Sequence, residues 1–453
     1  MSIPASDLPT HERPAPAVPP AERSSPRSAA YAGYTLLVLV VAYVLAFMDR
    51  QVLSLLVEPL KRDLHLSDLQ ISLLQGLAFA LFLSVSGLPL GRLVDRGRRT
   101  RLLALAVAGW SLMTGLSGLA RGFPLLLAAR AGVGLGEAAM TPSAYSLIGD
   151  RFAARRLGIA MGVYGAGPYL GSGLALLIGG LALRRLPRSI SLLGQPVHGW
   201  QVVFLGLAAV GLVVALWVWT VAEPPRHGVG AEARPTWPET FAYFRKNAAA
   251  LIAVNLCIGC ASMAMNGLLA WAPSLLVRGY GLRLPDAGQA LGWRIMLFGA
   301  AGALAAGALG DRLRRGGRAW GRLIVPVGAA LAAAPIAFAA ARAPSAGMLL
   351  TEVSALYVLL PLAIASGPAI LQEITPNRLR GVQHALAVLA SNLLGLGLGP
   401  LVVATVVDLG LRDERRLGEA LSYTLPAMLA LSTAAGLLAV RPYAAGLRQA
   451  EHA

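Results

Sequence analysis

Twelve long apolar stretches, separated by short polar connections, occupy most of this sequence. A helix needs roughly 20 apolar residues to cross the hydrocarbon core of a bilayer, and each stretch is at least that long. A helix in lipid satisfies its own backbone hydrogen bonds, so each stretch is expected to be a membrane-spanning helix. The expected helices cover residues 34–57, 71–91, 101–120, 124–148, 157–183, 200–222, 249–277, 288–310, 320–342, 346–371, 382–408 and 418–441.

The composition agrees with this placement in lipid. Hydrophobic residues make up 56% of the chain and charged residues only 13%, unlike the composition of a soluble domain. Segments of about 10 residues with alternating polarity, the pattern of a membrane β-barrel, do not appear. The 51 glycines are scattered through the apolar stretches, where small residues let helices pack closely. The expected fold class is an all-α membrane protein.

The formal charge of +17 raises the question of nucleic acid binding, but the distribution of the charge argues against it. Lysine and arginine concentrate in the tails and the even-numbered connections, as the positive-inside rule requires when both termini are cytoplasmic. We expect an integral protein of a bacterial-type inner (plasma) membrane. Residues 1–30, rich in proline, serine and alanine, predict a disordered cytoplasmic tail rather than a signal peptide, and residues 443–453 a second cytoplasmic tail.

The chain divides into two halves that repeat local features. The longest polar connection, residues 223–248, separates six expected helices in 31–222 from six in 249–442. "GRLVDRGRR", from Gly91 after the second helix, is echoed by "GALGDRLRR", from Gly307 after the eighth. "GAGPYLGSG" in the fifth helix is echoed by "GLGLGP" in the eleventh. Such repeats are typical of transporters in which two halves rock around a site at the membrane midplane.

These loops, the arginine of the fourth helix, the Gly-Pro helices and the six-plus-six layout resemble the major facilitator superfamily over residues 34–441. The resemblance implies two pseudo-symmetric six-helix bundles and transport by alternating access. "FMDRQVLSLLV", "RAGVGLGEA" and the segment beginning "HGWQVVFLG" resemble the spinster-like branch, whose animal members export lysolipids and sphingolipid phosphates. A similar Asp-Arg pair near the end of the first helix also resembles organic-anion symporters.

Four charged residues lie within the expected first and fourth helices. Asp49 and Arg50 are about 100° apart around their helix, so at least one of them needs a partner from another helix. Arg130 and Glu137 are seven residues apart and share a face, with three glycines between them that permit close approach of a neighbour. The resemblance implies that both helices line the transport cavity. A structural ion pair or snorkelling to the interface is the alternative role for Asp49 and Arg50.

We hypothesise that Asp49 and Glu137 carry coupling protons and that Arg130 anchors an anionic substrate. A buried carboxylate holds its proton more tightly and a nearby arginine opposes this, so Glu137 is expected to titrate. Guanidinium suits a bidentate carboxylate or phosphate. The candidate substrate-binding residues are Arg50, Arg130, Tyr164, Asn255, Asn266, Arg294 and Glu352. Snorkelling is the alternative for Arg294, helix-joining hydrogen bonds for the asparagines and aromatic packing for Tyr164.

The repeated loops are candidates for a cytoplasmic gate. The small Gly91 permits close helix approach, Asp95 is expected to cap the third helix, and Arg96 holds the loop. Gly307, Asp311 and Arg312 are their counterparts, although such basic loops also set topology. Candidate helix-bending residues are Gly167, Pro168, Gly399 and Pro400. The segment around Pro168 partly resembles the superfamily's antiporter signature, which favours export.

Together these features predict a secondary transporter, proton-coupled, that moves an amphipathic or lipid-related anion. An organic-anion:proton symporter or a multidrug efflux transporter is the alternative within transport. A membrane receptor or enzyme is disfavoured because no catalytic motif, metal cluster or phosphate-binding loop is visible. Cys257 and Cys260 are expected to pack, and His384 to lie at the surface. We expect no cofactor and no metal, and a monomer whose partners are its substrate, protons and membrane lipids.

Overall fold

A computed structural model of the chain describes residues 26–186, 189–192, 195–226, 236–315 and 321–451. Within these residues, twelve helical segments are long and apolar enough to cross a membrane. They coincide with the twelve predicted stretches, with ends that differ by several residues: the fourth runs over Phe123–Arg151 and the eighth over Leu284–Arg314. The predicted fold class, an all-α bundle of twelve spans, is confirmed.

The first six spans form one bundle, here called the N-half. Its elements are α1 (Pro26–Leu55), α2 (Val57–Leu64), α3 (Asp68–Ser72), η1 (Leu73–Leu77), α4 (Ala78–Arg96), α5 (Arg99–Gly118), α6 (Phe123–Glu137), α7 (Met140–Arg151), α8 (Ala154–Gly165), α9 (Gly167–Arg185), β1 (Ser189–Leu192), β2 (Gln195–His198) and α10 (Gly199–Trp219).

The last six spans form the C-half. Its elements are α12 (Ala248–Tyr280), α13 (Leu284–Arg294), η2 (Ile295–Gly299), α14 (Ala300–Arg315), η3 (Gly321–Leu323), α15 (Ile324–Ala340), α16 (Ala346–Ala365), α17 (Gly367–Ile374), η4 (Asn377–Leu379), α18 (Arg380–Ala390), η5 (Ser391–Leu398), α19 (Gly399–Thr405), η6 (Val406–Leu411), η7 (Glu414–Arg416) and α20 (Leu417–Glu451). The connection between the halves contains one further helix, α11 (Trp237–Lys246).

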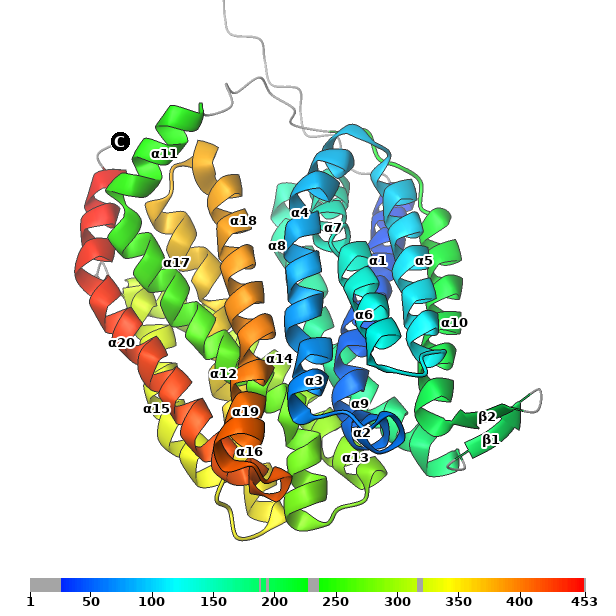
Figure 1. Cartoon of the computed structure of the whole chain (residues 1–453). Helices are drawn as coiled ribbons and strands as arrows, with labels where there is room; N and C mark the ends of the chain where they lie inside the picture. Colours follow the sequence, from blue (N-terminus) through cyan, green and yellow to red (C-terminus); the bar gives the residue numbers. More distant parts are fainter. Residues whose placement is uncertain (1–25, 187–188, 193–194, 227–235, 316–320, 452–453) are drawn as a thin grey trace, which may run out of the picture.

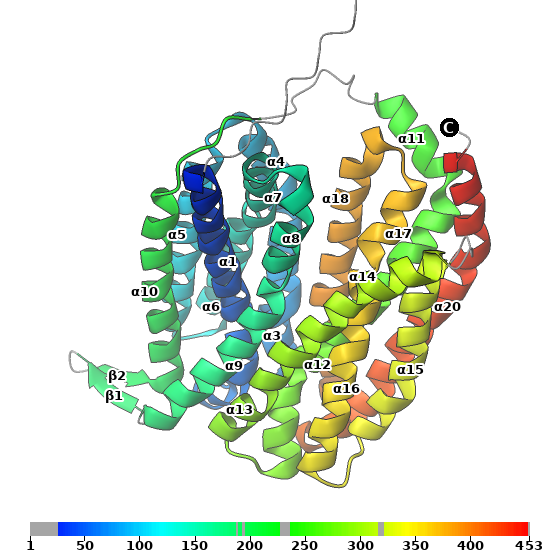
Figure 2. The ribbon, with the colours of Figure 1, turned by 180° about the vertical axis from the view of Figure 1, so that it is seen from behind.

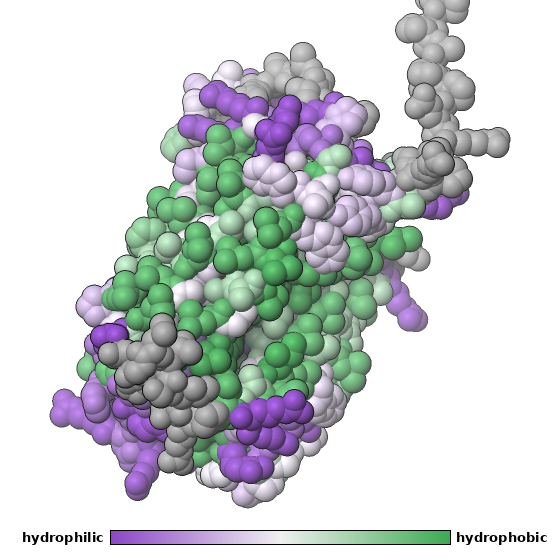
Figure 3. Space-filling view, turned by 90° about the vertical axis from the view of Figure 1, so that its right-hand side faces the viewer, coloured by the Kyte–Doolittle hydropathy of each residue, from purple (hydrophilic) through white to green (hydrophobic). Residues whose placement is uncertain are grey.

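The two bundles stand side by side (Figure 1; Figure 2). On the face shown in Figure 3, a broad band of hydrophobic side chains lies between two hydrophilic ends, as expected for a protein embedded in lipid. The first described helix begins and the last helix ends at the same end of the molecule, the top of Figure 1. We call this end the termini side and the other end the opposite side.

Two features of the ends differ from the sequence-based expectation. α20 continues as a helix to Glu451, past the predicted tail boundary at 442. On the opposite side, β1 and β2 form an antiparallel hairpin, with Ser189 paired to His198, that hydropathy does not signal (Figure 1). The predicted N-terminal tail lies mostly outside the described residues, since α1 begins at Pro26.

The halves meet on the opposite side through buried charges. The guanidinium of Arg278, at the end of α12, donates to both carboxylate oxygens of Asp68 at 2.7 and 2.9 Å and to Glu58 at 2.7 Å. Lys61 binds Asp68 and lies 2.6 Å from Glu414. Glu58, Lys61 and Asp68 are from the N-half. Arg278 and Glu414 are from the C-half, so this network fastens one bundle to the other.

Backbone contacts reinforce the same junction. Asp408 accepts a 2.7 Å hydrogen bond from the Leu69 amide, and the Ser72 hydroxyl donates to the Pro400 carbonyl at 3.1 Å. Along α9 and α13, glycines replace side chains: a Cβ built on Gly292 would lie 2.7 Å from the carbonyl oxygen of Gly173. Small residues at this crossing therefore let the two halves touch.

The termini side has no comparable fastening. Among the residues that the structure describes, no hydrogen bond or ion pair joins the halves there, and the ring centroids of Tyr145 and His384 lie 6.5 Å apart across the interface. The bundles therefore close together on the opposite side and separate toward the termini side (Figure 1).

Several helices are irregular near the centre of the molecule. α8 ends at Gly165 and α9 begins at Gly167, so the fifth span breaks at Ala166, two residues before Pro168. The eleventh span changes from the π-helix η5 to α19 at Gly399, directly before Pro400. This break and this change of helix type occur at the residues predicted to bend helices. π-helical turns, which frequently mark functional sites, also form η1 and η2.

Candidate functional site

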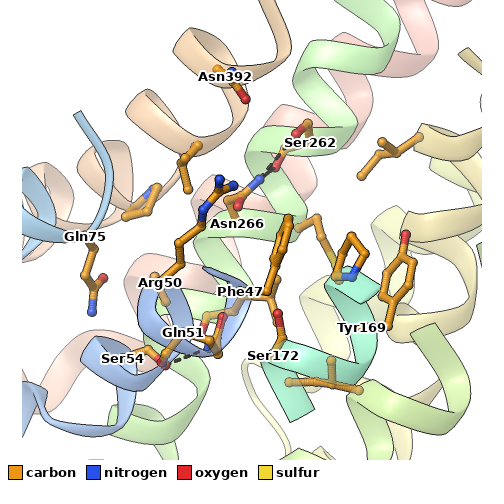
Figure 4. A pocket seen from close by; sticks show the side chains of 18 of the residues that line it. Phe47, Arg50, Gln51, Ser54, Gln75, Tyr169, Ser172, Ser262, Asn266 and Asn392 are labelled. Carbon is orange, nitrogen blue, oxygen red and sulfur yellow. Dashed lines mark hydrogen bonds between the residues drawn. The ribbon is translucent and has the colours of Figure 1, made fainter. Parts of the chain in front are cut away.

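A cavity of about 370 Å³ lies between the two halves (Figure 4). Side chains from α1, α9 and η1 on one half and from α12, η5 and α19 on the other contribute to its wall. Its polar lining residues are Arg50, Gln51, Ser54, Gln75, Ser172, Ser262, Asn266, Ser391 and Asn392. The cavity therefore has the shared walls expected of a site that two rocking halves enclose.

Arg50 is the one arginine among the described residues that line this cavity. It extends from α1 into the cavity (Figure 4). Its guanidinium lies 2.5 Å from Glu137 Oε2, and its Nε donates to the same oxygen at 2.6 Å. The Arg50 side chain is 19% exposed and that of Glu137 is fully buried, so the pair connects a buried carboxylate to the cavity wall. Glu137 Oε1 has no hydrogen-bond partner.

Asp49 and Arg130 form a second ion pair beside the first. Arg130 Nη1 lies 3.1 Å from Asp49 Oδ1, and the Thr114 hydroxyl donates to Asp49 Oδ2. Both charged side chains are nearly fully buried, and neither lines the cavity. The predicted proximity of Asp49, Arg130 and Glu137 is thus present. However, Arg50 and not Arg130 lies where it can contact an anion in the cavity.

Aromatic rings and glycines hold these charges in place. The guanidinium of Arg50 lies 4.5 and 4.7 Å from the ring centroids of Phe47 and Phe79, a cation–π geometry. Close helix approach at the glycines of α6 is confirmed: a Cβ on Gly134 would lie 2.6 Å from the Phe79 carbonyl oxygen, and one on Gly136 2.9 Å from Trp110 Cβ. α4 and α5 can therefore pack against the face that presents Arg130 and Glu137.

The remaining candidate substrate residues have different positions. Asn266 lines the cavity, whereas Asn255 lines a second cavity of about 120 Å³. Tyr164 is fully buried and stacks on Tyr43 with ring centroids 4.3 Å apart, the packing role considered as its alternative. Arg294 and Glu352 line neither cavity, and no ion pair joins them among the described residues.

Gln75 is a cavity residue that the sequence did not single out. It lies in the π-helix η1, and neither its amide nitrogen nor its amide oxygen has a hydrogen-bond partner. Because a buried polar group without a partner is costly, such an amide facing a cavity is a candidate ligand-binding group. Its one signal in the sequence is a glutamine inside the apolar run "ISLLQGLAF".

The loop after the second span differs from its predicted contacts. The Asp95 carbonyl, with those of Val94 and Gly97, accepts from Arg226. The third span is capped by Glu223 instead of Asp95, since Glu223 Oε2 accepts from the Thr100 amide at 2.9 Å. The prediction that Asp95 caps α5 was therefore wrong, because Glu223 approaches that helix end from the connection after α10.

The segments expected to be gate loops are helical here, with Gly91 inside α4 and Gly307 inside α14, and the two glycines make no close approach. A Cβ on either Gly91 or Gly307 would meet nothing within 4 Å. Asp311 binds Arg322 at 2.6 Å within the C-half, and Arg96 and Arg312 are exposed. Any gating contact of these two helix ends with the other half thus belongs to a different conformation.

The two cysteines and His384 lie away from the central cavity. Cys257 and Cys260 are buried and free, and Cys257 Sγ lies 3.7 Å from the Ser432 hydroxyl oxygen. His384 lines the second cavity instead of lying at the outer surface. No group of three or more His, Cys, Asp and Glu side chains able to hold a metal ion occurs in the part of the chain that the structure describes.

Comparison with known proteins agrees with this architecture. The family model of the Major Facilitator Superfamily matches residues 39–400. An MFS-type efflux pump of Mycolicibacterium smegmatis is 31% identical over 306 residues, 66% of each chain. A probable L-galactonate transporter of Escherichia coli is 29% identical over 297 residues, 63% of this chain and 62% of the relative. The sequence alignments thus span somewhat less than two thirds of these relatives.

Among solved structures, a bacterial homologue of the human lysosomal transporter Spinster in an inward-facing, unoccupied conformation is 26% identical. The superposition has a TM-score of 0.75 and covers 93% of this chain and 98% of the homologue. The predicted likeness to the spinster-like branch is confirmed. The twelve spans, the cavity between two six-helix halves and these matches together mean that the chain belongs to the Major Facilitator Superfamily and is an integral membrane transporter of a small-molecule substrate rather than an enzyme.

Proposed function

We propose that this protein is a proton-coupled secondary transporter that moves an amphipathic anion by alternating access. The observation that carries the proposal is the position of Arg50, whose guanidinium faces the central cavity while it is bound to the buried carboxylate of Glu137. One cation is thereby available both to an internal carboxylate and to a ligand in the cavity.

Competition for Arg50 provides the coupling. An anion that binds the Arg50 guanidinium draws it away from Glu137, which is then a buried carboxylate without its counter-ion. Because an unpaired charge is unfavourable in a low-dielectric interior, Glu137 takes up a proton. Conversely, protonation of Glu137 frees Arg50 for the anion. Proton uptake and anion binding therefore favour each other, and the free energy of this linkage is the same in both directions.

Asp49 supplies a second carboxylate to the same cluster. Its partners, Arg130 and Thr114, are buried with it, so the pair holds the first, third and fourth spans together beside the coupling pair. In this scheme Asp49 remains a candidate proton carrier. Arg130 holds Asp49 in position and does not bind the substrate. This role replaces the assignment of Arg130 as the anion anchor.

The shape of the site supports an amphipathic ligand. The first cavity is lined by polar groups that include Arg50, Gln75, Asn266 and Asn392. The second cavity shares Ile364 and Ser391 with the first and adds the apolar side chains of Ile258, Leu371, Ala387 and Val388. An anionic head at Arg50 and an apolar part toward the second cavity would use both. The spinster-like relatives support a lipid-related molecule as that ligand.

A small hydrophilic anion, such as a sugar acid, is the second candidate substrate. The polar groups around Arg50 and the volume of about 370 Å³ suit such a molecule without the second cavity. Similarity to a probable L-galactonate transporter favours it, and similarity to an efflux pump favours a drug-like ligand. The dependence of affinity on chain length separates these alternatives, because only an amphipathic ligand gains from the apolar extension.

We assign the termini side to the cytoplasm of a bacterial-type inner membrane. The positive-inside distribution of basic residues supports this orientation, in which the structure is inward-facing. The likeness to a solved inward-facing structure agrees with it. The ends of α4 and α14, which contain Asp95 and Asp311, would then meet the opposite half when the cytoplasmic side closes, and the Arg278 network would have to open.

The test is a ligand screen followed by flux measurement. Purified protein is heated with lysolipids of graded chain length, sugar acids and cationic drugs, and stabilising ligands are then assayed in proteoliposomes with and without a pH gradient. We expect an amphipathic anion to stabilise the protein and its flux to respond to the gradient. Binding with flux that ignores the gradient would reject the coupling scheme, and stabilisation by cationic drugs alone would reject the anionic substrate.

A further inference from the structure

Arg294 is a charged residue on the outer surface of the transmembrane region. It ends α13, about 15 Å along the helix from Leu284 at 1.5 Å per residue, within the eighth span. The side chains of Trp293, Leu297 and Leu304 on the same span are 43%, 59% and 69% exposed and form an apolar outer stripe. Ile295, the next residue and about 100° further around the helix, lines the central cavity, whereas Arg294 does not. Arg294 therefore lies between the lipid-facing stripe and the side of the helix that faces the transport site.

The guanidinium of Arg294 has no anionic partner in the protein. Its Nη1 donates to the Ala290 carbonyl at 2.6 Å, and its buried Nε has no hydrogen-bond partner. No carboxylate of the described residues lies within the 4.0 Å that defines an ion pair with it. The ionisable side chain that faces it from α16 is Tyr357, a fully buried phenol whose own hydroxyl has no partner.

An arginine in this position requires an anion that the protein does not provide. Charged side chains in a membrane are normally paired or directed to water, because hydrocarbon does not solvate them. The ring of Trp293 fixes the guanidinium, with Arg294 Cζ 4.3 Å from the ring centroid. From this depth the long Arg294 side chain can reach toward the headgroup level by snorkelling, and tryptophan is enriched at that level.

We propose that Arg294 binds the phosphate of an anionic phospholipid at the lipid-facing surface where α13 lies beside α16. Guanidinium offers parallel N–H donors that match phosphate oxygens. The apolar stripe below it accommodates acyl chains, which is why the phosphate is assigned to a lipid and not to a free ion. α13, α14 and α16 face the viewer in Figure 2, on the outside of the C-half.

The test measures lipid retention by the full chain. Native mass spectrometry of detergent-purified protein is run with phosphatidylglycerol, with phosphatidylcholine and with inorganic phosphate, for the unchanged chain and for Arg294→Gln and Arg416→Gln. Arg416 is the matched control, since it lies on the same half but is paired with Glu419 at 2.7 Å. We expect phosphatidylglycerol to be retained preferentially, Arg294→Gln to lower its affinity about fivefold, and Arg416→Gln to leave it unchanged.

Equal retention by Arg294→Gln and the unchanged chain would overturn the proposal, as would displacement of the lipid by millimolar inorganic phosphate. A second measurement applies if Arg294→Gln does not fold. Brominated lipids quench the fluorescence of nearby tryptophans. The quenching that depends on Trp293 is the difference between the unchanged chain and Trp293→Phe, and it should be larger with brominated phosphatidylglycerol than with brominated phosphatidylcholine. Equal quenching by the two lipids would also reject the site.

Discussion

Arg50 Nη2 lies 2.5 Å from Glu137 Oε2, although the two residues belong to different helices and are 87 positions apart. The contact joins a side chain on the wall of the central cavity to a carboxylate that is shielded from it. Substrate and proton can therefore compete through one guanidinium. The predictions below separate this coupling pair from the structural charges around it.

The first prediction concerns Glu137. Glu137→Gln keeps the size of the side chain but can no longer take up a proton, so flux driven by a pH gradient should fall by about 5- to 150-fold, the usual range of a coupling free energy. Counterflow of substrate without a gradient should persist. Glu239→Gln, on the exposed helix α11, is the control. Gradient-driven flux equal to that of the control variant would contradict the coupling role.

The second prediction distinguishes the two arginines. Arg50→Gln should weaken binding of an anionic ligand by roughly 10- to 150-fold, because a charge-assisted contact is lost, and should also destabilise the protein, because Glu137 is left buried without its counter-ion. Arg130→Gln leaves Asp49 buried without its counter-ion, so we expect roughly 3–5 kcal/mol of destabilisation. Ligand titration and thermal unfolding in detergent measure both quantities. If Arg130→Gln instead abolishes binding in a protein of unchanged stability, the two roles are reversed.

The third prediction addresses the junction on the opposite side. Asp68→Asn weakens the paired contact with Arg278, so the state that is open on the opposite side should become roughly tenfold more populated. The readout is labelling of a cysteine at Ser172, in a chain with Cys257 and Cys260 replaced by serine, by an impermeant maleimide added on the opposite side. Asp63→Asn is the control, since Asp63 bonds Trp200 and Arg62 within one half. Equal labelling of the two variants would show that the network does not hold this state closed.

The fourth prediction concerns helix packing near the charges. Gly134→Ala places a methyl group 2.6 Å from the Phe79 carbonyl oxygen, and the overpacking should destabilise the protein by roughly 1–3 kcal/mol. Gly149→Ala, where a Cβ meets nothing within 4 Å, should be neutral or stabilising by up to about 1 kcal/mol because alanine favours helix. Thermal unfolding of the two variants gives the comparison. Equal effects would mean that α6 and α4 are less closely packed than described.

The fifth prediction is a pH effect outside the membrane. Burial raises the pKa of Glu223, but hydrogen bonds from the Thr100 backbone and the Arg99 side chain outweigh it, and the pKa lies below its ordinary value of 4.5. The cap therefore contributes its full stability above that ordinary value and loses it as the pH falls further, through the folded-state pKa. Glu223→Gln should remove this part of the acid sensitivity. An identical fall in melting temperature for both proteins between pH 5 and 3 would contradict it.

Hydropathy predicted the helices well because membrane insertion depends on local composition. Twelve apolar stretches became twelve spans. The fifth span breaks beside Pro168, where proline removes a backbone donor, whereas at Pro400 the eleventh span passes from π-helix to α-helix without a break. The β1–β2 hairpin has no comparable signal, because two strands of four residues are too short to show a periodic pattern.

The residue types of the site were also visible in the chain. Charged residues inside apolar runs are unusual enough that Asp49, Arg50, Arg130 and Glu137 stood out, and all four meet in one cluster. Gln75 did not stand out, because an uncharged amide in a membrane helix most often joins helices by a hydrogen bond. Its missing partners become apparent only when the surrounding side chains are in place.

The amino-acid order thus specified the membrane class, the twelve helices and the set of buried charges, all of which follow from local hydropathy and from the cost of charge in lipid. The folded arrangement decided which charges pair and which one meets the substrate. Asp49 and Arg50 differ by one position, and the rotation of α1 against α6 alone directs one into the protein and the other into the cavity. The contact between Arg278 and Asp68, 210 positions apart, likewise depends on how two half-bundles dock, which no local pattern encodes.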